Sequence, residues 1–420
     1  MPTQDFKALW TAYAVSTYGT WIAFGAFPLL AVRELHASAI AVSLLEAAGL
    51  AVAALVAFPL GPWIDHRAKR PVMVAMDLLR FVAMATVPIA YLFQALTYAQ
   101  LLVVSIVSGT ANIAFTAASG AYLKHLVHRD QLLAANGRFE GTSWTATALG
   151  PPLGGALVVV LGPVVTVAAD ACSYLLSALA VRRIRGTDLA SPSSTAGRRG
   201  PTPTPTPTPT PSSGARLRAA DFFSGWHLIL DDPGLRRLYL NGITVSGLIM
   251  ATTPLLAVLL LGEYQLSAWQ YGLAFGLPSI GGFVGARLSA RLVTRFGRHR
   301  VMIVTGWLRS IFPLGLAFTR PGVSGLVTVI VVEALLITCM GIFNPISATE
   351  RLQRTPTDQA ARVLTAWSVS SKLAQAGTMV IWGLLATITS PLTAITVSGV
   401  LLLGTPLLLP KRDQVQLATK

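Results

Sequence analysis

Long apolar stretches recur along the whole chain and limit what it can fold into. The first covers residues 8–32 and contains no charged side chain. Further apolar stretches lie near 39–60, 72–94, 98–122, 142–162, 164–181, 238–262, 270–290, 301–319, 323–347, 363–387 and 390–409. Each is long enough to cross a bilayer core of about 30 Å as a helix that rises about 1.5 Å per residue. The sequence therefore predicts an all-α integral membrane protein with about twelve transmembrane helices.

The charge pattern supports a membrane protein and predicts its orientation. Only 12% of the residues are charged, against about 25% in a soluble domain. The net charge of +15 would suit nucleic-acid binding, but its distribution argues against that partner. If the N-terminus is cytoplasmic, the predicted outer loops hold only Arg33 and Arg320 of the 32 Lys and Arg residues. We therefore expect a multi-pass protein of a bacterial inner or plasma membrane, with both termini cytoplasmic.

The sequence gives no indication of a cofactor, a metal or an enzyme. Cys172 and Cys339 lie inside predicted spans without a CxxC partner or a nearby histidine cluster, so we predict buried thiols and no metal site. A membrane enzyme would need a catalytic constellation such as GxSxG or HExxH, which is absent. A receptor or scaffold would need a sizeable soluble domain, and the longest hydrophilic stretch is the one in the middle of the chain.

That hydrophilic stretch separates two sets of six predicted spans. We predict an N-terminal half at 1–183, a cytoplasmic linker at 184–236, a C-terminal half at 237–410 and a tail at 411–420. The linker contains PTPTPTPTPTP at 201–211, which favours polyproline II and makes a semi-rigid spacer. A ligand for a proline-recognition domain is the alternative. Residues 221–230 predict a short interfacial helix or an ordinary polar-to-apolar transition.

An internal echo relates the two halves. GPWIDHRAKRPVM at 61–73 and TRFGRHRVM at 294–302 each contain a basic cluster followed by Val-Met. Both fall between the second and third spans of their half. Because each half has six spans, the second enters the membrane in the same orientation as the first. We therefore predict parallel halves related by an axis along the membrane normal.

The first of these loops resembles the loop motif of the major facilitator superfamily. Its matching positions are Gly61, Asp65, Arg67, Lys69 and Arg70. His66 stands where the family usually has Arg, and Ala68 where it usually has Gly. The resemblance implies that Asp65 faces the N-terminal end of helix 11 and helps to lock one conformation. The alternative is a basic loop that only sets topology.

A second motif, ALGPPLGGAL, resembles the antiporter motif of the export branch of this superfamily. The matching residues are Gly150, Pro151, Gly154 and Gly155. Gly150 and Gly154 share one helix face, where another backbone can approach. The resemblance implies that this partner is helix 8, which carries its own glycines at 276, 281, 282 and 285. Generic helix packing is the alternative.

The resemblance covers nearly the whole chain. Residues 126–142, 170–179 and 362–375 are similar to exporters of the macrolide-efflux and enterobactin-secretion type of drug:proton antiporter. Many proton-coupled drug exporters carry an Arg on span 4, and relatives often have an Asp at the position of Thr20; both features are missing here. Proton coupling would therefore use other groups.

Ionisable residues inside spans are candidates for function, because each costs about 2.5–3.5 kcal/mol at a helix centre. Asp77 and Arg80 are spaced to pair on one face of span 3. The candidates for coupling or substrate contact are Glu333, Asp170, Glu46, Lys372 and Arg309. Glu333 is favoured because the resemblance places helix 10 on the central cavity. A structural pair of Glu333 with Lys372 or Arg309 is the alternative.

Aromatic and amide side chains are candidates for lining a cavity. They are Tyr18, Trp21, Asn112 and Asn241, with Tyr13, Phe24, Phe115 and Thr244 beside them; core or lipid-facing positions are the alternative. We predict a monomer in the lipid bilayer that exports an amphipathic small molecule, such as an antibiotic or siderophore, by proton-coupled antiport. An importer or facilitator of a small solute is the alternative function.

Overall fold

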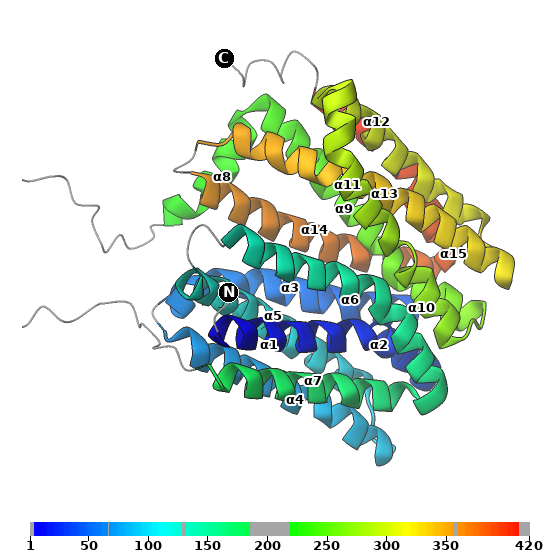
Figure 1. Ribbon diagram of the computed structural model, residues 1–420. Helices are drawn as coiled ribbons and strands as arrows, with labels where there is room; N and C mark the ends of the chain where they lie inside the picture. Colours follow the sequence, from blue (N-terminus) through cyan, green and yellow to red (C-terminus); the bar gives the residue numbers. More distant parts are fainter. Residues whose placement is uncertain (1–3, 66, 128–131, 185–218, 357–358, 411–420) are drawn as a thin grey trace, which may run out of the picture.

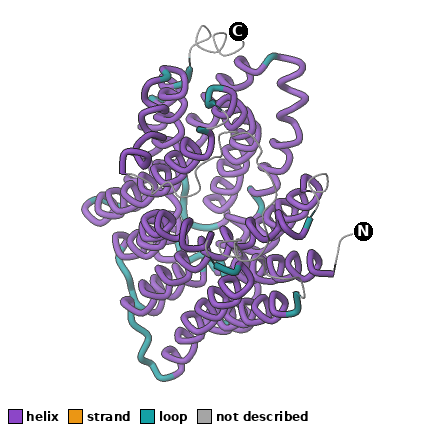
Figure 2. The backbone as a smooth tube through the Cα atoms, turned by 90° about the vertical axis from the view of Figure 1, so that its left-hand side faces the viewer, coloured by secondary structure: helices purple, strands orange, loops and turns teal. Residues whose placement is uncertain are grey.

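The computed structural model describes residues 4–65, 67–127, 132–184, 219–356 and 359–410. His66, the Pro-Thr repeat and the tail at 411–420 lie outside this part. Within it the fold is all-α, and no strand occurs (Figures 1 and 2). The predicted fold class is confirmed.

The first half of the chain forms a run of long helices joined by short turns. Its elements are α1 (Gln4–Ile22), α2 (Ala26–Leu29), the π-helical turn η1 (Leu30–Glu34), α3 (Ala39–Asp65), α4 (Lys69–Leu92), α5 (Tyr98–Leu126), α6 (Leu132–Leu161) and α7 (Pro163–Arg182). Proline or a glycine with positive φ marks several boundaries. Gly162, at φ 86°, precedes Pro163, the first residue of α7. A proline is tolerated at this position, because the backbone N–H that it lacks would have no partner within the helix.

The second half repeats this pattern after one extra helix. Its elements are α8 (Ala219–Asp231), α9 (Pro233–Ala257), the π-helical turn η3 (Val258–Glu263), α10 (Ala268–Gly276), α11 (Ser279–Phe296), α12 (Arg298–Ile311), the 3-10 turn η4 (Phe312–Phe318), α13 (Val323–Gln353), α14 (Ala360–Ile388), α15 (Pro391–Leu402) and the 3-10 turn η5 (Thr405–Leu408).

The number of spans agrees approximately with the prediction. In the described residues, ten helical segments are long and apolar enough to cross a membrane. These segments join neighbouring elements, so that α1, α2 and η1 form one segment over Gln4–Glu34. The apolar helix Pro391–Leu402 is shorter, and α14, with 29 residues, is not among the ten. The predicted twelve is therefore an approximate count.

The internal repeat extends to backbone detail. Ala39 and Ala268 begin α3 and α10, and Lys69 and Arg298 begin α4 and α12, so each pair is 229 residues apart. The same offset relates His36 and Gln265, two non-glycine residues with φ of 48° and 51°. It also relates the hydrogen bonds that close the two π-helical turns, from Leu35 N to Leu30 O and from Tyr264 N to Leu259 O. The two halves are therefore built in parallel.

Among the described side chains, the buried apolar clusters that join the two halves lie toward one end of the bundle. We call the end that carries the start of α1 and the turn between α11 and α12 the termini end, and the other the opposite end. Near the opposite end, Leu29 and Ala39 share a buried cluster with residues of the second half, and Ala47 shares one with Ala376. The helix pairs that contribute most to the contact between the halves are α6 with α10 and α3 with α14.

Buried clusters at the termini end stay within one half. One contains Phe6, Met73 and Ile184 of the first half. Two others contain residues of the second half only, among them Met302 in one and Val363 in the other. Among the described residues, the apolar contacts that join the halves thus lie toward the opposite end.

Helix α8 lies against α14. The indole Nε1 of Trp226 donates to Ser370 Oγ at 2.8 Å, and Ile229 is fully buried in a cluster with Val363. Gly225 allows α8 to approach the carbonyl of Arg362. The stretch 221–230 is therefore helical, and its Trp226 and Ile229 pack on protein.

Candidate functional site

The predicted gating loop is described in part. Gly61 and Asp65 belong to α3, but their side chains lie outside the described part, as does His66. The contact of Asp65 with helix 11 therefore stays a prediction. Lys69 Nζ donates to the carbonyl of Arg67 at 2.9 Å, and Arg70 donates to the carbonyl of Arg182. Because Arg182 ends α7, this contact places a cation at a helix C-terminus, where it is favourable.

A charge network occupies the equivalent end of the second half. The buried carboxylate of Glu350 lies 2.8 Å from Arg354 Nε and 3.8 Å from Arg298 Nη1. Arg354 also pairs with Asp232 at 3.3 Å, and Asp232 caps α9 by accepting from Leu235 N. Sequence reasoning missed this network. Its signals were the i,i+4 spacing of Glu350 and Arg354 and the Asp-Pro pair at the start of α9.

The glycine motif on α6 packs on two different helices, whereas the prediction named helix 8 as its only partner. A Cβ at Gly150 or Gly154 would overlap Trp21 and Ile22, so this face packs on α1 in the same half. The expectation that these two glycines meet helix 8 is therefore wrong. Gly155 makes the contact with span 8, where a Cβ would overlap the backbone of Ala268 and Trp269.

Some of the glycines of span 8 pack on α6, and others pack elsewhere. Gly272 packs on the carbonyl of Pro151, and Gly276 packs on Pro152. Gly281 and Gly285 instead face α13. The seam between α6 and α10 therefore consists of Gly155, Gly272, Gly276 and the two prolines, and we call it the glycine seam.

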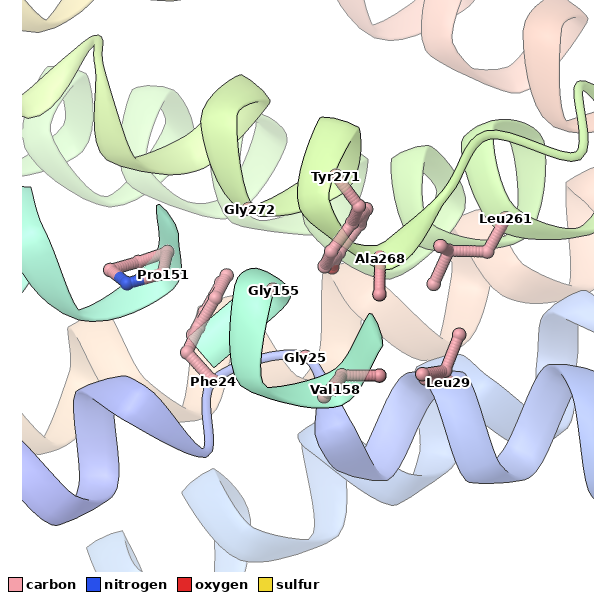
Figure 3. A pocket seen from close by; sticks show the side chains of 10 residues that line it. All are labelled: Phe24, Gly25, Leu29, Pro151, Gly155, Val158, Leu261, Ala268, Tyr271 and Gly272. Carbon is pink, nitrogen blue, oxygen red and sulfur yellow. The ribbon is translucent and has the colours of Figure 1, made fainter. Parts of the chain in front are cut away.

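Tyr271 fills the space beside the glycine seam. Figure 3 shows it pointing from α10 toward Gly25 and Gly155, in a small pocket that Phe24 and Pro151 also line. Gly25 has φ of 82°, and a Cβ there would lie 2.5 Å from the Tyr271 ring, so only glycine fits. The ring centroids of Tyr271 and Phe24 are 6.4 Å apart.

Polar groups accompany this seam. Arg33 Nη2 donates across the halves to the carbonyl of Leu266 at 2.7 Å. Glu46, on α3, is half-buried. The predicted cavity residue Phe24 lies in this seam, in contact with Tyr271 and Phe275.

A buried polar cluster lies inside the first half. Arg80 Nη2 is 2.7 Å from Asp77 Oδ1, and Ser177 donates to Asp77 Oδ2 at 2.6 Å. The guanidinium stacks on Tyr174 and Phe115, with its carbon 4.5 and 5.0 Å from the two ring centroids. The structure therefore contains the pair expected on span 3, and embeds it among side chains from α5 and α7.

Asp170 belongs to the same cluster. It accepts from Ser173 Oγ at 3.3 Å, and it lies one turn before Tyr174 on the same face of α7. The Tyr174 hydroxyl lies 2.8 Å from Thr20 Oγ1 on α1. Asp77, Arg80 and Asp170 are 0%, 3% and 1% exposed. We call this set of groups, with Ser173 and Ser177, the N-half cluster.

Arg309 occupies the repeat-equivalent position in the second half, because it follows Arg80 by 229 residues. It donates to Asn241 Oδ1, and its guanidinium carbon lies 3.5 Å from the ring centroid of Phe343. Asn241 in turn donates to the carbonyl of Thr405 at 2.7 Å. Among the described residues, no carboxylate comes within ion-pairing distance of Arg309. We call this set the C-half cluster.

The remaining predicted residues are separated from one another. Within the described chain, Glu333 and Lys372 make no ion pair with each other, and Glu333 makes none with Arg309. The structure therefore does not contain the alternative structural pair. Glu333 is half-buried and lies one turn from Ile337, which packs at Gly282 beside Trp144 of the first half. This places Glu333 near the boundary of the halves.

The predicted cavity residues divide into accessible and buried groups. Asn112 is exposed and accepts from Arg80 at 3.5 Å, whereas Tyr18 and Trp21 are half-buried. Asn241 is only 1% exposed, so its prediction as a cavity residue is wrong. Its side-chain amide is hydrogen-bonded to Arg309 and to the carbonyl of Thr405. Both partners are distant in sequence, so the sequence of one helix could not indicate them.

Comparison with known proteins identifies the class. The family model of the Major Facilitator Superfamily matches residues 9–378 and 238–417. The chain therefore belongs to this superfamily of membrane transporters, and it is not an enzyme. Solved structures share the fold: the nucleoside transporter NupG, at 10% identity, has a TM-score of 0.70 over 98% of this chain and 99% of its own.

Two further proteins are similar to this chain, one in structure and one in sequence. A bacterial homologue of the human lysosomal transporter Spinster, solved inward-facing and unoccupied, has a TM-score of 0.68 at 15% identity over 100% of this chain and 98% of its own. The multidrug efflux pump Tap of Mycolicibacterium fortuitum is 25% identical over 313 residues, which cover 72% of this chain and 69% of the pump.

Proposed function

We propose that this transporter exports an amphipathic small molecule by alternating access, in exchange for protons. Its halves, residues 1–183 and 237–410, move as units, and both termini face the cytoplasm. The similarity to the efflux pump Tap supports export. The fold alone does not decide the direction, since the nucleoside transporter NupG shares it.

The glycine seam carries this proposal. It brings the backbones of α6 and α10 into contact near the opposite end, while the buried clusters at the termini end each stay in one half. Halves that separate at one end and seal at the other are what alternating access requires. With the termini cytoplasmic, the sealed end faces outward, and the substrate enters from the cytoplasm.

Everted membrane vesicles test the function. Vesicles that contain the protein and are energised by respiration should accumulate ethidium, and a protonophore should abolish the accumulation. A panel that includes a macrolide and a siderophore would define the substrate class. Accumulation of solutes in right-side-out vesicles, without any in everted ones, would instead establish an importer.

A matched pair of glycine variants tests the seam. Gly155→Ala places a methyl group against the backbone of Ala268 and Trp269, whereas a Cβ at Gly120 meets nothing within 4 Å. Overpacking costs about 1–3 kcal/mol. Gly155→Ala should therefore lose export at a normal membrane level, and Gly120→Ala should keep it. Equal export by both variants would show that the seam does not close during transport.

A further inference from the structure

The N-half cluster contains more acid than base. Among its described residues, the two carboxyls of Asp77 and Asp170 accompany the single guanidinium of Arg80, which pairs with Asp77, and all three residues are almost fully buried. A guanidinium stays protonated in proteins. With both carboxyls ionised, the cluster would therefore hold one uncompensated negative charge, which is costly away from water. One of the two carboxyls must carry a proton while the cluster remains closed.

The contacts indicate which carboxyl carries it. Asp77 has the direct ion pair with Arg80 and accepts a second hydrogen bond from Ser177. Asp170 accepts from Ser173 at the longer distance of 3.3 Å. The ionised form is better stabilised at Asp77, because charge-assisted bonds favour the charged carboxylate. Asp170 is therefore the protonated partner.

A pair of hydroxyl groups leads from α7 to the exposed side of α1. Tyr174 follows Asp170 by one turn on the same face of α7, and its hydroxyl lies 2.8 Å from Thr20 Oγ1. Thr20 is exposed and donates to the carbonyl of Ser16 at 2.9 Å, so the Tyr174 hydroxyl donates to Thr20. When Asp170 loses its proton to the Tyr174 oxygen, Tyr174 can pass its own proton to Thr20. Tyr174 thus gains one proton as it gives up another, and the exposed Thr20 releases its own proton to water.

Arg80 can respond to this transfer. Its Nε is buried and has no hydrogen-bond partner in the described structure. Asp170, Ser173, Tyr174 and Ser177 line one face of α7 at i, i+3, i+4 and i+7, and Arg80 pairs with Asp77 while it stacks on Tyr174, one turn from Asp170. Ionisation of Asp170 would therefore draw Arg80 away from Asp77 and change how α4 packs on α7.

Among the described residues, no hydrogen bond or ion pair brings another charged group to the cluster, and Glu46 lies on α3, which contributes no group to it. Among the described residues, α4 contributes only Asp77 and Arg80 within its membrane segment. Asn112 faces the cluster from α5, and α1 has no Asp, Glu, Lys or Arg after Lys7. On α6, Arg138 lies at the termini end, over the ring of Phe6.

We propose that Asp170 is the proton-carrying residue of this transporter, with Arg80 as its exchangeable counter-ion and Tyr174 and Thr20 as its proton path. This rests on the proposed function as a proton-coupled transporter. It gives Glu333, at the boundary of the halves, a different role: contact with the substrate.

Two measurements on the purified full chain test the site without depending on transport direction. The first is the infrared band of protonated carboxyl groups, followed from acidic to alkaline buffer. Wild type should show a buried carboxyl that titrates, Asp170→Asn should lack it, and Glu333→Gln should keep it. A band that persists in Asp170→Asn would overturn the proposal.

The second measurement compares driven transport with exchange in proteoliposomes, with ethidium as the probe. Asp170→Asn should lose gradient-driven transport and keep energy-independent exchange. Tyr174→Phe, which keeps the ring that stacks on Arg80, should slow driven transport more than tenfold while exchange stays normal. If Asp170→Asn fails to fold, Tyr174→Phe decides the matter: normal driven transport in that variant would overturn the proton path. Absence of ethidium transport by wild type would count against the proposed function, and the infrared result would still judge the site.

Discussion

The N-half and C-half clusters occupy equivalent places in the repeat and differ in charge. Arg80 and Arg309 are 229 residues apart, and each stacks on a phenylalanine of the following span, Phe115 or Phe343. Arg80 has Asp77 at i−3, whereas the equivalent residue of the second half is Gly306. The two halves therefore share the arginine and the aromatic ring beneath it, and among the described residues only the first half has carboxyls beside them.

The difference in charge between the two clusters indicates two different roles for the same arrangement of helices. In the second half, Arg309 bonds to the neutral Asn241, which is tied to Thr405. This cluster contains no carboxyl among the described residues, and its hydrogen bonds hold spans 7, 9 and 12 together. The first half has two buried carboxyls, and under the proposed function it is the half that carries the proton.

The sequence predicted the architecture better than the contacts. Apolar length gave the spans, and the loops that end in Val-Met gave the parallel repeat, in which Met73 and Met302 are both buried. Periodicity identifies which residues share a helix face. It does not identify the neighbouring helix, so Gly150 and Gly154 were assigned to helix 8 although they pack on α1.

Side-chain partners were the least predictable feature. The pair of Asp77 and Arg80 followed from local spacing, because i and i+3 are neighbours on any helix. Asn241 was predicted to face a cavity, since its partners Arg309 and Thr405 are distant in sequence. The absence of a partner for Glu333 among the described ion pairs likewise depends on how helices are arranged in space.

The largest expected effect comes from removing the two arginines in turn. Arg80→Met leaves Asp77 and Asp170 buried without a cation, and breaking a buried pair in this way costs about 3–5 kcal/mol. Arg309→Met removes a cation that lacks a counter-ion and leaves only Asn241 unsatisfied, a loss of about 1–3 kcal/mol at most. Thermal unfolding in detergent should show a much larger decrease for Arg80→Met. Equal decreases would mean that the two clusters are energetically alike.

A smaller effect is expected from giving the second half the missing acid. Gly306→Asp places a carboxylate three residues before Arg309, but a Cβ there overlaps a terminal methyl of Leu409. The single variant should lose about 1–3 kcal/mol through overpacking. Adding Leu409→Ala makes room, and the double variant should unfold at a higher temperature than Gly306→Asp alone. If Leu409→Ala brings no recovery, the geometry around Arg309 does not match that around Arg80.

The loops at the termini end offer a weaker contrast. Asp65→Asn removes a charge from the predicted contact with helix 11, worth about 0.3–2 kcal/mol. Labelling of single cysteines should then shift toward the inward-facing state. Glu350→Gln, which breaks the described pairs with Arg354 and Arg298, should shift labelling in the same direction. Unchanged labelling and transport for Asp65→Asn would reduce the first loop to a topology signal.

The smallest effect is expected at the connection between the halves. The Pro-Thr repeat at 201–211 lies outside the described residues, and we predict that it acts as a tether. Helix α8, which follows it, is held on α14 by the bond from Trp226 to Ser370 and by buried Ile229. The second half thus has its own anchor for the chain, and the repeat needs only to reach it.

Replacing the repeat with a Gly-Ser segment of equal length should leave transport nearly unchanged, since length matters there more than sequence. Trp226→Phe, which removes the anchoring bond, serves as the comparison and should reduce transport more. Loss of transport in a correctly inserted Gly-Ser variant would show that the repeat itself binds a partner.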